Sequence, residues 1–469
     1  MSWDTLADAA SWFFLAYFVA LGAGYLLVNV CSVLELPRQR ESLIPSLLPR
    51  PHSNYELPVS VIVPAHDEEA IIAASVHSVL QLEYPLFEVI VVNDGSRDGT
   101  LEALRTELEL VPFPEAYRQR LAAKPVRGVY RSARFPNVRV IDKENGGKAD
   151  ATNAGVNAAR YPLVCIVDAD SILERSSLRQ VAVPFLIEPH IVAVGGSVRI
   201  VNGSTVRGGF LEEVGLSRKM LPLFQVVEYL RAFLFGRAGW APLNAVPIVS
   251  GAFGAFRKEA LVDAGGYHSG SLGEDMELVL RLHRRNRLAR RKYRIAFLIN
   301  PICWTDAPES LGVLRGQRIR WQRGLGESLA RNRALLFHPR GGAVGWVMFP
   351  FMIASELLGP VVELAGYLFM ILGFAFGFIS AWVFWSFLAL AVSIGLMLSA
   401  SALLLEEVAC HVYKRPSQLL ALTAVMLLEN FGYHQLVLLW RLQGLWRWLV
   451  GAPATWGDTQ RGASWQKEL

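Results

Sequence analysis

Two aspartates, Asp168 and Asp170, follow directly on the apolar run 163–167 and are separated by one alanine. An apolar run that ends in acids is typical of a buried parallel strand, and open α/β sheets bind ligands beyond the carboxyl ends of such strands. Because side chains alternate along an extended chain, both carboxylates leave it on the same side, close enough to share a divalent cation and the phosphates it bridges. Taken alone, the pair is more typical of solvated loop acids.

Two glycine-containing turns upstream add groups that suit a nucleotide. The turn at 93–96 reads Asn-Asp-Gly-Ser and contains Asp94, and the turn at 146–147 is followed by Lys148 and a helical pattern. A lysine at a helix N-terminus is suited to contact an anion. Each turn is also typical of an ordinary capping loop. The second turn lacks the longer glycine loop and the Gly-Lys-Ser/Thr of a Walker motif, which argues against ATP hydrolysis.

Two acids, Glu274 and Asp275, open a stretch in which Met276, Val279 and Leu280 form an apolar stripe of helical spacing. Acids in a first helical turn are favoured by the helix dipole, which alone would explain them. The functional interpretation is a general base that takes a proton from an acceptor hydroxyl.

The last motif is Gln317, Arg318, Arg320 and Trp321, followed by Gln-Arg-Gly at 322–324. Arginines around a tryptophan beside a membrane are typical of an interfacial anchor. The same residues suit a diphosphate leaving group held by the arginines and a sugar ring stacked on the indole.

These motifs lie at the ends of expected strands. Apolar stretches at 59–63, 88–92, 138–141 and 163–167 alternate with helical patterns, and the alternation continues to about Cys303. Such alternation indicates an α/β domain with a mainly parallel sheet. The proline- and arginine-containing stretch 108–137 is expected to be an excursion from the core.

Both ends of the chain carry membrane-like segments. Hydrophobic residues make up 52% of the 469 residues, and 13 are tryptophans, which is unusual for a wholly soluble protein. The stretch 11–34 has no charged residue and suffices for one span at about 20 residues per span. Arg38, Arg40 and Arg50 follow it, so the positive-inside rule places the N-terminus outside and the next domain in the cytoplasm.

The C-terminal part is more apolar still. No Lys or Arg occurs between Arg340 and Lys414, which accommodates two spans at roughly 349–374 and 382–405. A further apolar segment at 419–440 contains Glu429 and His434 and suits either a third span or a re-entrant helix. The number and parity of these spans stay open.

The net charge of +5 is concentrated in two arginine clusters, at 281–294 and 315–340, which suit anionic headgroups or a phosphorylated substrate. No DNA- or RNA-binding motif accompanies the charge, so nucleic acid is not expected as a partner. The four cysteines are scattered without metal-ligand spacing and are expected to be reduced thiols.

In their order along residues 58–325, the motifs resemble those of the family 2 membrane-embedded glycosyltransferases, the group of cellulose, hyaluronan and poly-N-acetylglucosamine synthases. The matching segments are 61–65 (Val-Ile-Val-Pro-Ala), 93–96, 147–150, 168–170, 273–275 and 317–321. The resemblance implies a GT-A fold, a nucleotide-sugar-binding α/β domain, joined to an α-helical transmembrane region.

The resemblance also implies roles for these residues. Asp94 would contact the uridine of a UDP-sugar, with Lys148 near its base or diphosphate, and Asp168 would lie at the donor phosphates. The metal, Mg²⁺ or Mn²⁺, would be held by Asp168 and most directly by Asp170. The remaining assignments are Asp275 as catalytic base, Arg318 and Arg320 at the diphosphate, and Trp321, Gln317 and Glu274 at the acceptor. Asn93 departs from the more usual Asp-Asp pair, which puts only the fine geometry there in doubt.

The implied reaction is inverting transfer of a sugar from a UDP-sugar to a growing β-linked polysaccharide, which is then extruded across the membrane. Residues 144–151 look most like those of poly-N-acetylglucosamine synthases, so UDP-GlcNAc is the expected donor and UDP-glucose, for a glucan synthase, the next candidate. A non-processive transferase acting on a lipid or polyprenyl phosphate is the first alternative, although such enzymes generally lack the 317–321 motif. A non-enzymatic membrane receptor or scaffold with a degenerate transferase fold is the second, and the presence of every acid that the chemistry needs argues against it.

Together these expectations divide the chain into five parts in a multi-pass protein of the inner (plasma) membrane. They are an N-terminal membrane helix (1–36), a cytoplasmic GT-A domain (37–310), amphipathic interface helices with the Gln-Arg-x-Arg-Trp motif (311–342), C-terminal transmembrane or interfacial helices (343–450) and a tail (451–469). A small accessory membrane subunit is a candidate partner beside the lipid bilayer.

Overall fold

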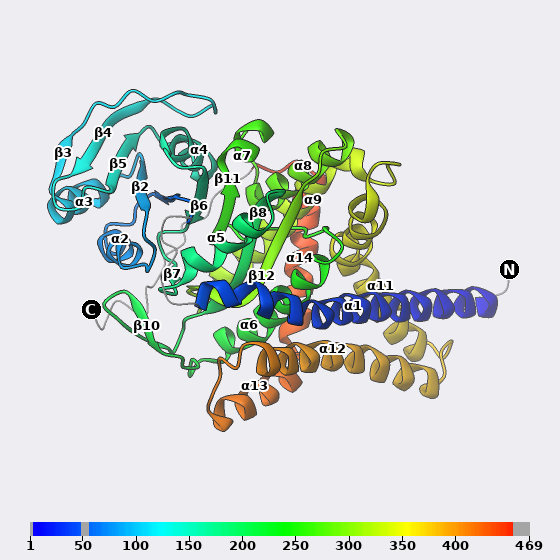
Figure 1. Cartoon of the computed structure of the whole chain (residues 1–469). Helices are drawn as coiled ribbons and strands as arrows, with labels where there is room; N and C mark the ends of the chain where they lie inside the picture. Colours follow the sequence, from blue (N-terminus) through cyan, green and yellow to red (C-terminus); the bar gives the residue numbers. More distant parts are fainter. Residues whose placement is uncertain (1–2, 48–55, 454–469) are drawn as a thin grey trace.

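The computed structural model describes residues 3–47 and 56–453 of the chain (Figure 1). Arg50 and, from residue 454 onward, the tail predicted at 451–469 lie outside the described residues. An α/β domain built on one ten-stranded sheet lies at the end of a group of long apolar helices.

Four parallel strands form the centre of the domain, and all four were predicted from the sequence. Their order in the sheet is β5-β2-β1-β6. Nearly every residue of these strands is buried, as expected for a sheet covered on both faces. The strands are β1 (Val59–Ala65), β2 (Phe87–Asp94), β5 (Val138–Lys143) and β6 (Leu163–Val167).

The sheet becomes mixed on both sides of this parallel core. Next to β6 lie β11 (Phe253–Arg257), β8 (Ile191–Ile200), β12 (Arg294–Thr305) and β7 (Ile172–Leu173), and β11 runs antiparallel to both of its neighbours. On the other side, β4 (Val126–Ser132) and β3 (Leu110–Pro112) form an antiparallel edge. The stretch 108–137, expected to be an excursion, therefore contributes two edge strands. A separate hairpin is formed by β9 (Thr205–Arg207) and β10 (Phe210–Glu213).

Helices pack on the sheet and fix where its polar turns lie. In α4 (Lys148–Ala158), Gly155 lies so close to β1 that an added Cβ would come within 2.4 Å of Ile62 Cγ2. The small residue lets the helix approach the strand, which places Lys148 beyond the strand ends. The other helices of the domain are α2 (Ile72–Leu80), α3 (Thr100–Leu108), α5 (Ser177–Ile187), α6 (Met220–Leu230), η2 (Arg231–Phe235), η3 (Ala238–Trp240), α7 (Lys258–Ala264), α8 (Glu274–Leu288), α9 (Leu311–Arg331) and η4 (Arg333–Leu335).

Two described helices are long and apolar enough to cross a membrane, at Asp8–Pro37 within α1 (Trp3–Leu47) and Ala381–Ala409, which is α12. They contain the predicted spans 11–34 and 382–405. In Figure 1, α1 and α12 run side by side away from the sheet, and the two helices are in contact.

Two bent helix pairs raise the number of candidate spans to four if each pair is one span. The first, bent by 46°, joins Val344–Leu357 to Gly359–Ala375 and contains the predicted 349–374 segment. The second, bent by 59°, joins α13 (Pro416–Leu428) to α14 (Tyr433–Leu449) and contains the predicted 419–440 segment. Gly432 lies at this bend with φ of 105°, a conformation that favours glycine. The first pair consists of η5 (Val344–Met348), α10 (Phe349–Phe351), η6 (Met352–Leu357) and α11 (Gly359–Ala375).

A buried ion pair fastens the apolar helices to the sheet. Arg199 of β8 donates from Nη2 to Glu406 Oε2 of α12 at 2.6 Å, and both side chains are only 1% exposed. Glu406 Oε1 also accepts from the backbone N–H of Val412 at 3.2 Å. Breaking such a pair from one side leaves an uncompensated charge in a low-dielectric setting.

We expect Glu406→Gln to lower the free energy of unfolding by about 3–5 kcal/mol, because Arg199 stays charged and buried. The double variant Arg199→Met/Glu406→Leu should be more stable than the single one, since it removes both charges. Thermal and chemical unfolding in detergent measures both. As a control, Glu212→Gln disrupts the exposed Arg207–Glu212 pair, whose side chains are 78% and 49% exposed, and should cost less than about 1 kcal/mol. Equal losses in Glu406→Gln and the control would contradict the assignment.

Candidate active site

Four of the residues singled out from the sequence meet at the carboxyl edge of the parallel strands. Asp168 follows β6, Lys148 begins α4, and Glu274 and Asp275 begin α8. Lys148 Nζ lies 2.5 Å from Asp168 Oδ1 and 3.9 Å from Glu274 Oε1. Residues more than one hundred positions apart in the chain therefore form one polar cluster, which we call the acid–lysine cluster (Lys148, Asp168, Glu274 and Asp275).

The backbone of Gly251 joins Lys148 to Asp275. Lys148 Nζ donates to Gly251 O at 3.1 Å, and Gly251 N donates to Asp275 Oδ2 at 3.0 Å. Asp275 Oδ1 accepts from its neighbour Met276 N at 2.8 Å. A Cβ on residue 251 would lie 3.1 Å from Lys148 Nζ, so a glycine keeps this approach open. Asp275 is thus held in a fixed orientation at the start of α8.

Charge in this cluster is unbalanced. Burial opposes the charge of Lys148, but Asp168 and Glu274 outweigh it and raise the pKa of the lysine, which stays protonated. Burial raises the pKa of Glu274, and the nearby Asp275 raises it further, while Lys148 opposes both. Within the cluster, one ammonium therefore faces three carboxyl groups, and the guanidinium of Arg237 adds a second positive charge near Asp275.

The carboxylates suit a metal only together with other ligands. Within the described residues, no group of three or more His, Cys, Asp or Glu side chains is placed to hold an ion. Asp168 and Asp170 are both partly buried at the strand end. Magnesium-type ions in nucleotide sites use one or two carboxylates and complete their shell with water and substrate phosphates. Two hard oxygen donors fit that mode.

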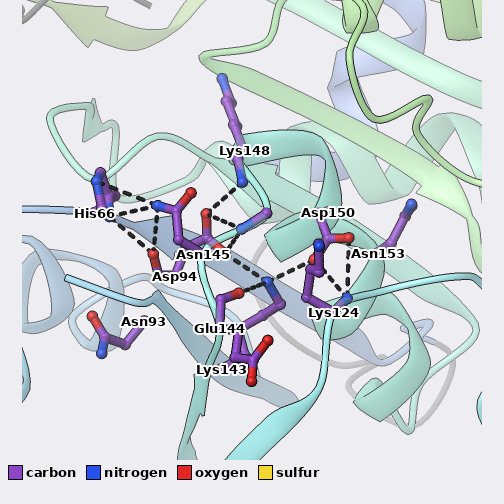
Figure 2. Close-up of polar contacts among 12 residues, drawn as sticks. His66, Asn93, Asp94, Lys124, Lys143, Glu144, Asn145, Lys148, Asp150 and Asn153 are labelled. Carbon is purple, nitrogen blue, oxygen red and sulfur yellow. Dashed lines mark hydrogen bonds and ion pairs between the residues drawn. The ribbon is translucent and has the colours of Figure 1, made fainter.

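Asp94 lies deeper, in a network of its own. Its carboxylate is buried and accepts from Lys143 Nζ at 2.6 Å, from Gly146 N at 3.0 Å and from Gly147 N at 2.7 Å. Lys143 also lies 2.6 Å from Asp150 Oδ1. Figure 2 shows this network and the side chain of Lys148 extending away from it. Asp94 therefore holds the turn from which α4 and Lys148 start, and its predicted contact with uridine stays a prediction.

Several residues of this network were not predicted from the sequence. Lys143 is fully buried between Asp94 and Asp150, although lysine at a strand end usually signals exposure. His66 Nδ1 lies 2.9 Å from Asp94 O, and Asn145 Nδ2 donates to the same carbonyl at 3.0 Å. No periodicity marks these contacts, because they join three separate strand ends.

The 317–321 motif lies on α9, and its parts differ in exposure. Arg318 is 3% exposed and donates from Nη2 to Glu228 Oε2 at 2.6 Å. Its guanidinium also lies 4.4 Å from the ring centroid of Trp321, whose side chain is 44% exposed. Arg318 therefore forms an ion pair with Glu228, a residue that the sequence analysis did not identify. This arrangement favours support of the indole by Arg318, and its predicted diphosphate contact stays a prediction.

The remaining predicted residues lie nearby but make fewer defined contacts. Gln317 has a buried Oε1 without a hydrogen-bond partner in the described part of the chain, and Arg320 is partly buried. Tyr229 of α6 lies 6.5 Å from Trp321 between ring centroids. Burial raises the pKa of Tyr229, and the charge of Asp170 adds to the rise, which places the second acid near this aromatic pair.

Comparison with known proteins places the chain in a family. A family model described as glycosyl transferase family group 2 matches residues 163–405, just over half of the chain, and one described as glycosyl transferase family 2 matches residues 60–263. The chain therefore belongs to glycosyltransferase family 2. This assignment agrees with the family that the order of motifs indicated.

Among curated proteins, the chain is similar to the poly-β-1,6-N-acetyl-D-glucosamine synthases of Staphylococcus epidermidis, 28% identical over 275 residues, and of Staphylococcus aureus strain COL, 29% identical over 275 residues. Each match covers 58% of this chain and 56% of the relative, so the chain spans about half the length of the curated relatives it matches.

Among solved structures, it is similar to a mannosyltransferase from Pyrobaculum calidifontis in complex with GDP-Man and Mn²⁺, with a TM-score of 0.51 and 19% identity, over 94% of this chain and 100% of that one. The likeness confirms the predicted GT-A type of fold.

We expect Asp94→Asn to lower the free energy of unfolding by about 1–3 kcal/mol, because the buried ammonium of Lys143 and two backbone N–H groups lose a charged acceptor. Lys143 keeps Asp150, which limits the loss. Unfolding midpoints measure the change. Glu102→Gln, at a side chain that is 73% exposed, is the control and should leave the midpoint unchanged. An equally stable Asp94→Asn protein would show that the carboxylate does not hold this turn.

Proposed function

We propose that the chain is an inverting glycosyltransferase that transfers GlcNAc from UDP-GlcNAc to a growing β-linked polysaccharide. The acid–lysine cluster carries the proposal, because it places an oriented carboxylate, Asp275, beside groups suited to a sugar nucleotide. The names of the staphylococcal relatives support the sugar and the polymeric product.

Asp275 is the proposed base. Its carboxylate takes the proton of the acceptor hydroxyl as the hydroxyl oxygen forms a bond to the anomeric carbon of the donor. The bond between that carbon and the diphosphate oxygen breaks, and UDP leaves with the electron pair. Attack from the opposite face inverts the anomeric centre. The two backbone N–H donors at Gly251 and Met276 fix the carboxylate so that it needs no rearrangement during the step.

The donor diphosphate is proposed to lie against Lys148, Asp168 and Asp170. A Mg²⁺ or Mn²⁺ ion held by the two aspartates would neutralise charge that builds up on the leaving diphosphate. Lys148 supplies a second positive charge, which stays protonated beside Asp168 and Glu274. Arg320 and Arg318, on α9, are the further candidates for the phosphates; Nη2 of Arg318 is paired with Glu228, but its Nε and Nη1 have no hydrogen-bond partner among the described residues.

Trp321 is the proposed acceptor platform. Its indole is exposed on one side and contacts the Arg318 guanidinium on the other, which fixes the ring plane. Gln317 and Glu274 complete the acceptor set, and Gln317 Oε1, which has no hydrogen-bond partner among the described residues, would accept from a sugar hydroxyl.

The acceptor motif adjoins the apolar helices, which supports extrusion of the product. Gln322, next to Trp321, donates to Glu356 O at 3.0 Å and accepts from Arg441 Nε at 2.9 Å. Glu356 and Arg441 lie on the two bent helix pairs. We propose a multi-pass protein of the plasma membrane with the catalytic domain in the cytoplasm, the domain limits given above, and a small membrane subunit as a candidate partner.

Purified protein given UDP-GlcNAc and Mn²⁺ should make long GlcNAc chains, which mass analysis and gel sizing of labelled product detect. UDP-glucose should be a poor donor. Single-sugar lipid products would identify the non-processive transferase instead, and glucan made preferentially from UDP-glucose would identify a glucan synthase.

Asp275→Asn should lower the transfer rate by about 10²–10⁴-fold, the usual contribution of a general base, with UDP affinity unchanged. Asp263→Asn, at an exposed acid of α7, is the matched control and should retain full activity. Unchanged polymer output from Asp275→Asn would remove the base from the mechanism and revive the non-enzymatic alternative.

Asp170→Ala should abolish turnover and make UDP binding insensitive to Mn²⁺, because one of two metal ligands is lost. Calorimetry of UDP binding with and without Mn²⁺ measures this directly, with Asp263→Asn again as the control. Robust turnover of the wild-type protein in EDTA would contradict the metal role.

A further inference from the structure

Arg237 is a partly buried cation near the candidate active site that the reaction described above does not use. It follows η2 and precedes η3. Its Nη1 is buried and has no hydrogen-bond partner in the described part of the chain. Its guanidinium lies 3.8 Å from the ring centroid of Phe233. A buried donor without a partner costs free energy, so its presence in a folded protein needs an explanation.

Arg237 ends a row of side chains that starts at Trp321. Tyr229 lies 6.5 Å from Trp321 and 5.6 Å from Phe233, both measured between ring centroids. Tyr229, Phe233 and Arg237 are spaced four residues apart, and α6 passes into η2 without a break. The spacing places Tyr229 and Phe233 on one side of the helix, and Arg237, just beyond its end, lies over the Phe233 ring. The row therefore connects the proposed acceptor platform to the guanidinium of Arg237.

Helix α1 packs against the backbone on either side of Arg237, in η2 and η3. Ser32 Oγ donates to Leu234 O of η2 at 2.5 Å. In η3, an added Cβ on Gly239 would meet Val28 O of α1 at 2.1 Å, so the two backbones touch. η2 is a π-helical turn, a conformation that is often found at functional sites. Arg237 is thus held on a rigid support.

Electrostatics place Arg237 beside the proposed base. Burial lowers the pKa of Arg237 to about 10, and the charges of Asp275 and Tyr229 oppose this fall. The guanidinium therefore stays protonated and interacts with the carboxylate of Asp275. No hydrogen bond between the two is formed, which leaves Nη1 available to a ligand that enters between them.

We propose that Arg237 is a positioning residue for the acceptor, donating from Nη1 to an oxygen of its terminal sugar while Trp321 stacks on the acceptor chain. The contact turns the attacking hydroxyl toward Asp275. This inference rests on the proposed glycosyl transfer and assigns a residue to its acceptor side. A sugar oxygen is the partner that we expect for Nη1, because the row of side chains that ends at Arg237 begins at Trp321, the proposed acceptor platform. The carboxylate whose charge acts most strongly on the guanidinium is that of Asp275, the proposed base.

The test separates acceptor from donor effects in the full-length protein. Arg237→Ala and Arg237→Lys are assayed with UDP-GlcNAc and a soluble GlcNAc oligosaccharide as acceptor. Loss of one hydrogen bond from a charged donor corresponds to roughly a 10–100-fold rise in KM for the acceptor. UDP affinity and hydrolysis of the donor by water should stay within about twofold of wild type. Arg237→Lys should retain an intermediate KM, because the ammonium can still donate.

Arg207→Ala, at an arginine of β9 whose side chain is 78% exposed, is the matched control and should leave every quantity unchanged. An unaltered acceptor KM in both Arg237 variants, or an equal loss of UDP affinity, would overturn the assignment. If Arg237→Ala fails to fold, the KM of Arg237→Lys and rescue of Arg237→Gly by added guanidinium decide the matter. Wild-type protein without any transfer would refute the proposed function itself, whereas active wild type with unaffected variants refutes only the role of Arg237.

Discussion

One ammonium group, that of Lys148, holds together an edge of the sheet at which three carboxyl groups converge. It lies 2.5 Å from Asp168 and donates to the backbone that orients Asp275. Carboxyl groups this close repel one another, and the elevated pKa of Glu274 reflects their shared burial. The proposed donor diphosphate would add more negative charge, which Lys148 and a divalent cation would offset.

The neighbouring network has the opposite character. Asp94, Lys143 and Asp150 are all buried, and their charges are compensated by each other and by backbone N–H groups. Fully satisfied buried networks rigidify the segments that they join. This one fixes the turn at 144–147, from which α4 starts. A static network therefore supports the reactive one. The side chain of Lys148 extends away from the Asp94 network (Figure 2) and contacts Asp168.

The parallel strands, the long helices and several site residues could be predicted from the sequence. The physical signals that revealed them also explain which parts of the structure were missed. Apolar runs with abrupt polar ends predicted the four parallel strands, and uncharged stretches predicted the long helices. The antiparallel half of the sheet was missed, since β11 and β8 are joined to their neighbours by long connections. Partners such as Glu228, Lys143 and Arg237 were missed because they meet the motifs only after folding. The motifs themselves named Asp168, Lys148 and Asp275, whose types and positions at strand ends carried the signal.

The site is also continuous with the apolar helices, which gives the membrane part a role in shaping it. Helix α1 contacts η3 next to Arg237, and α9 places Trp321 while its Gln322 bonds to the bent helix pairs. Arg199 ties the sheet to α12 at a third point. A sheet edge alone supplies the acids, whereas both proposed acceptor residues, Trp321 and Arg237, lie on segments fastened to the apolar helices. Displacing those helices would therefore move the acceptor side of the site relative to the acids, so that the geometry needed for transfer depends on the membrane part being in place.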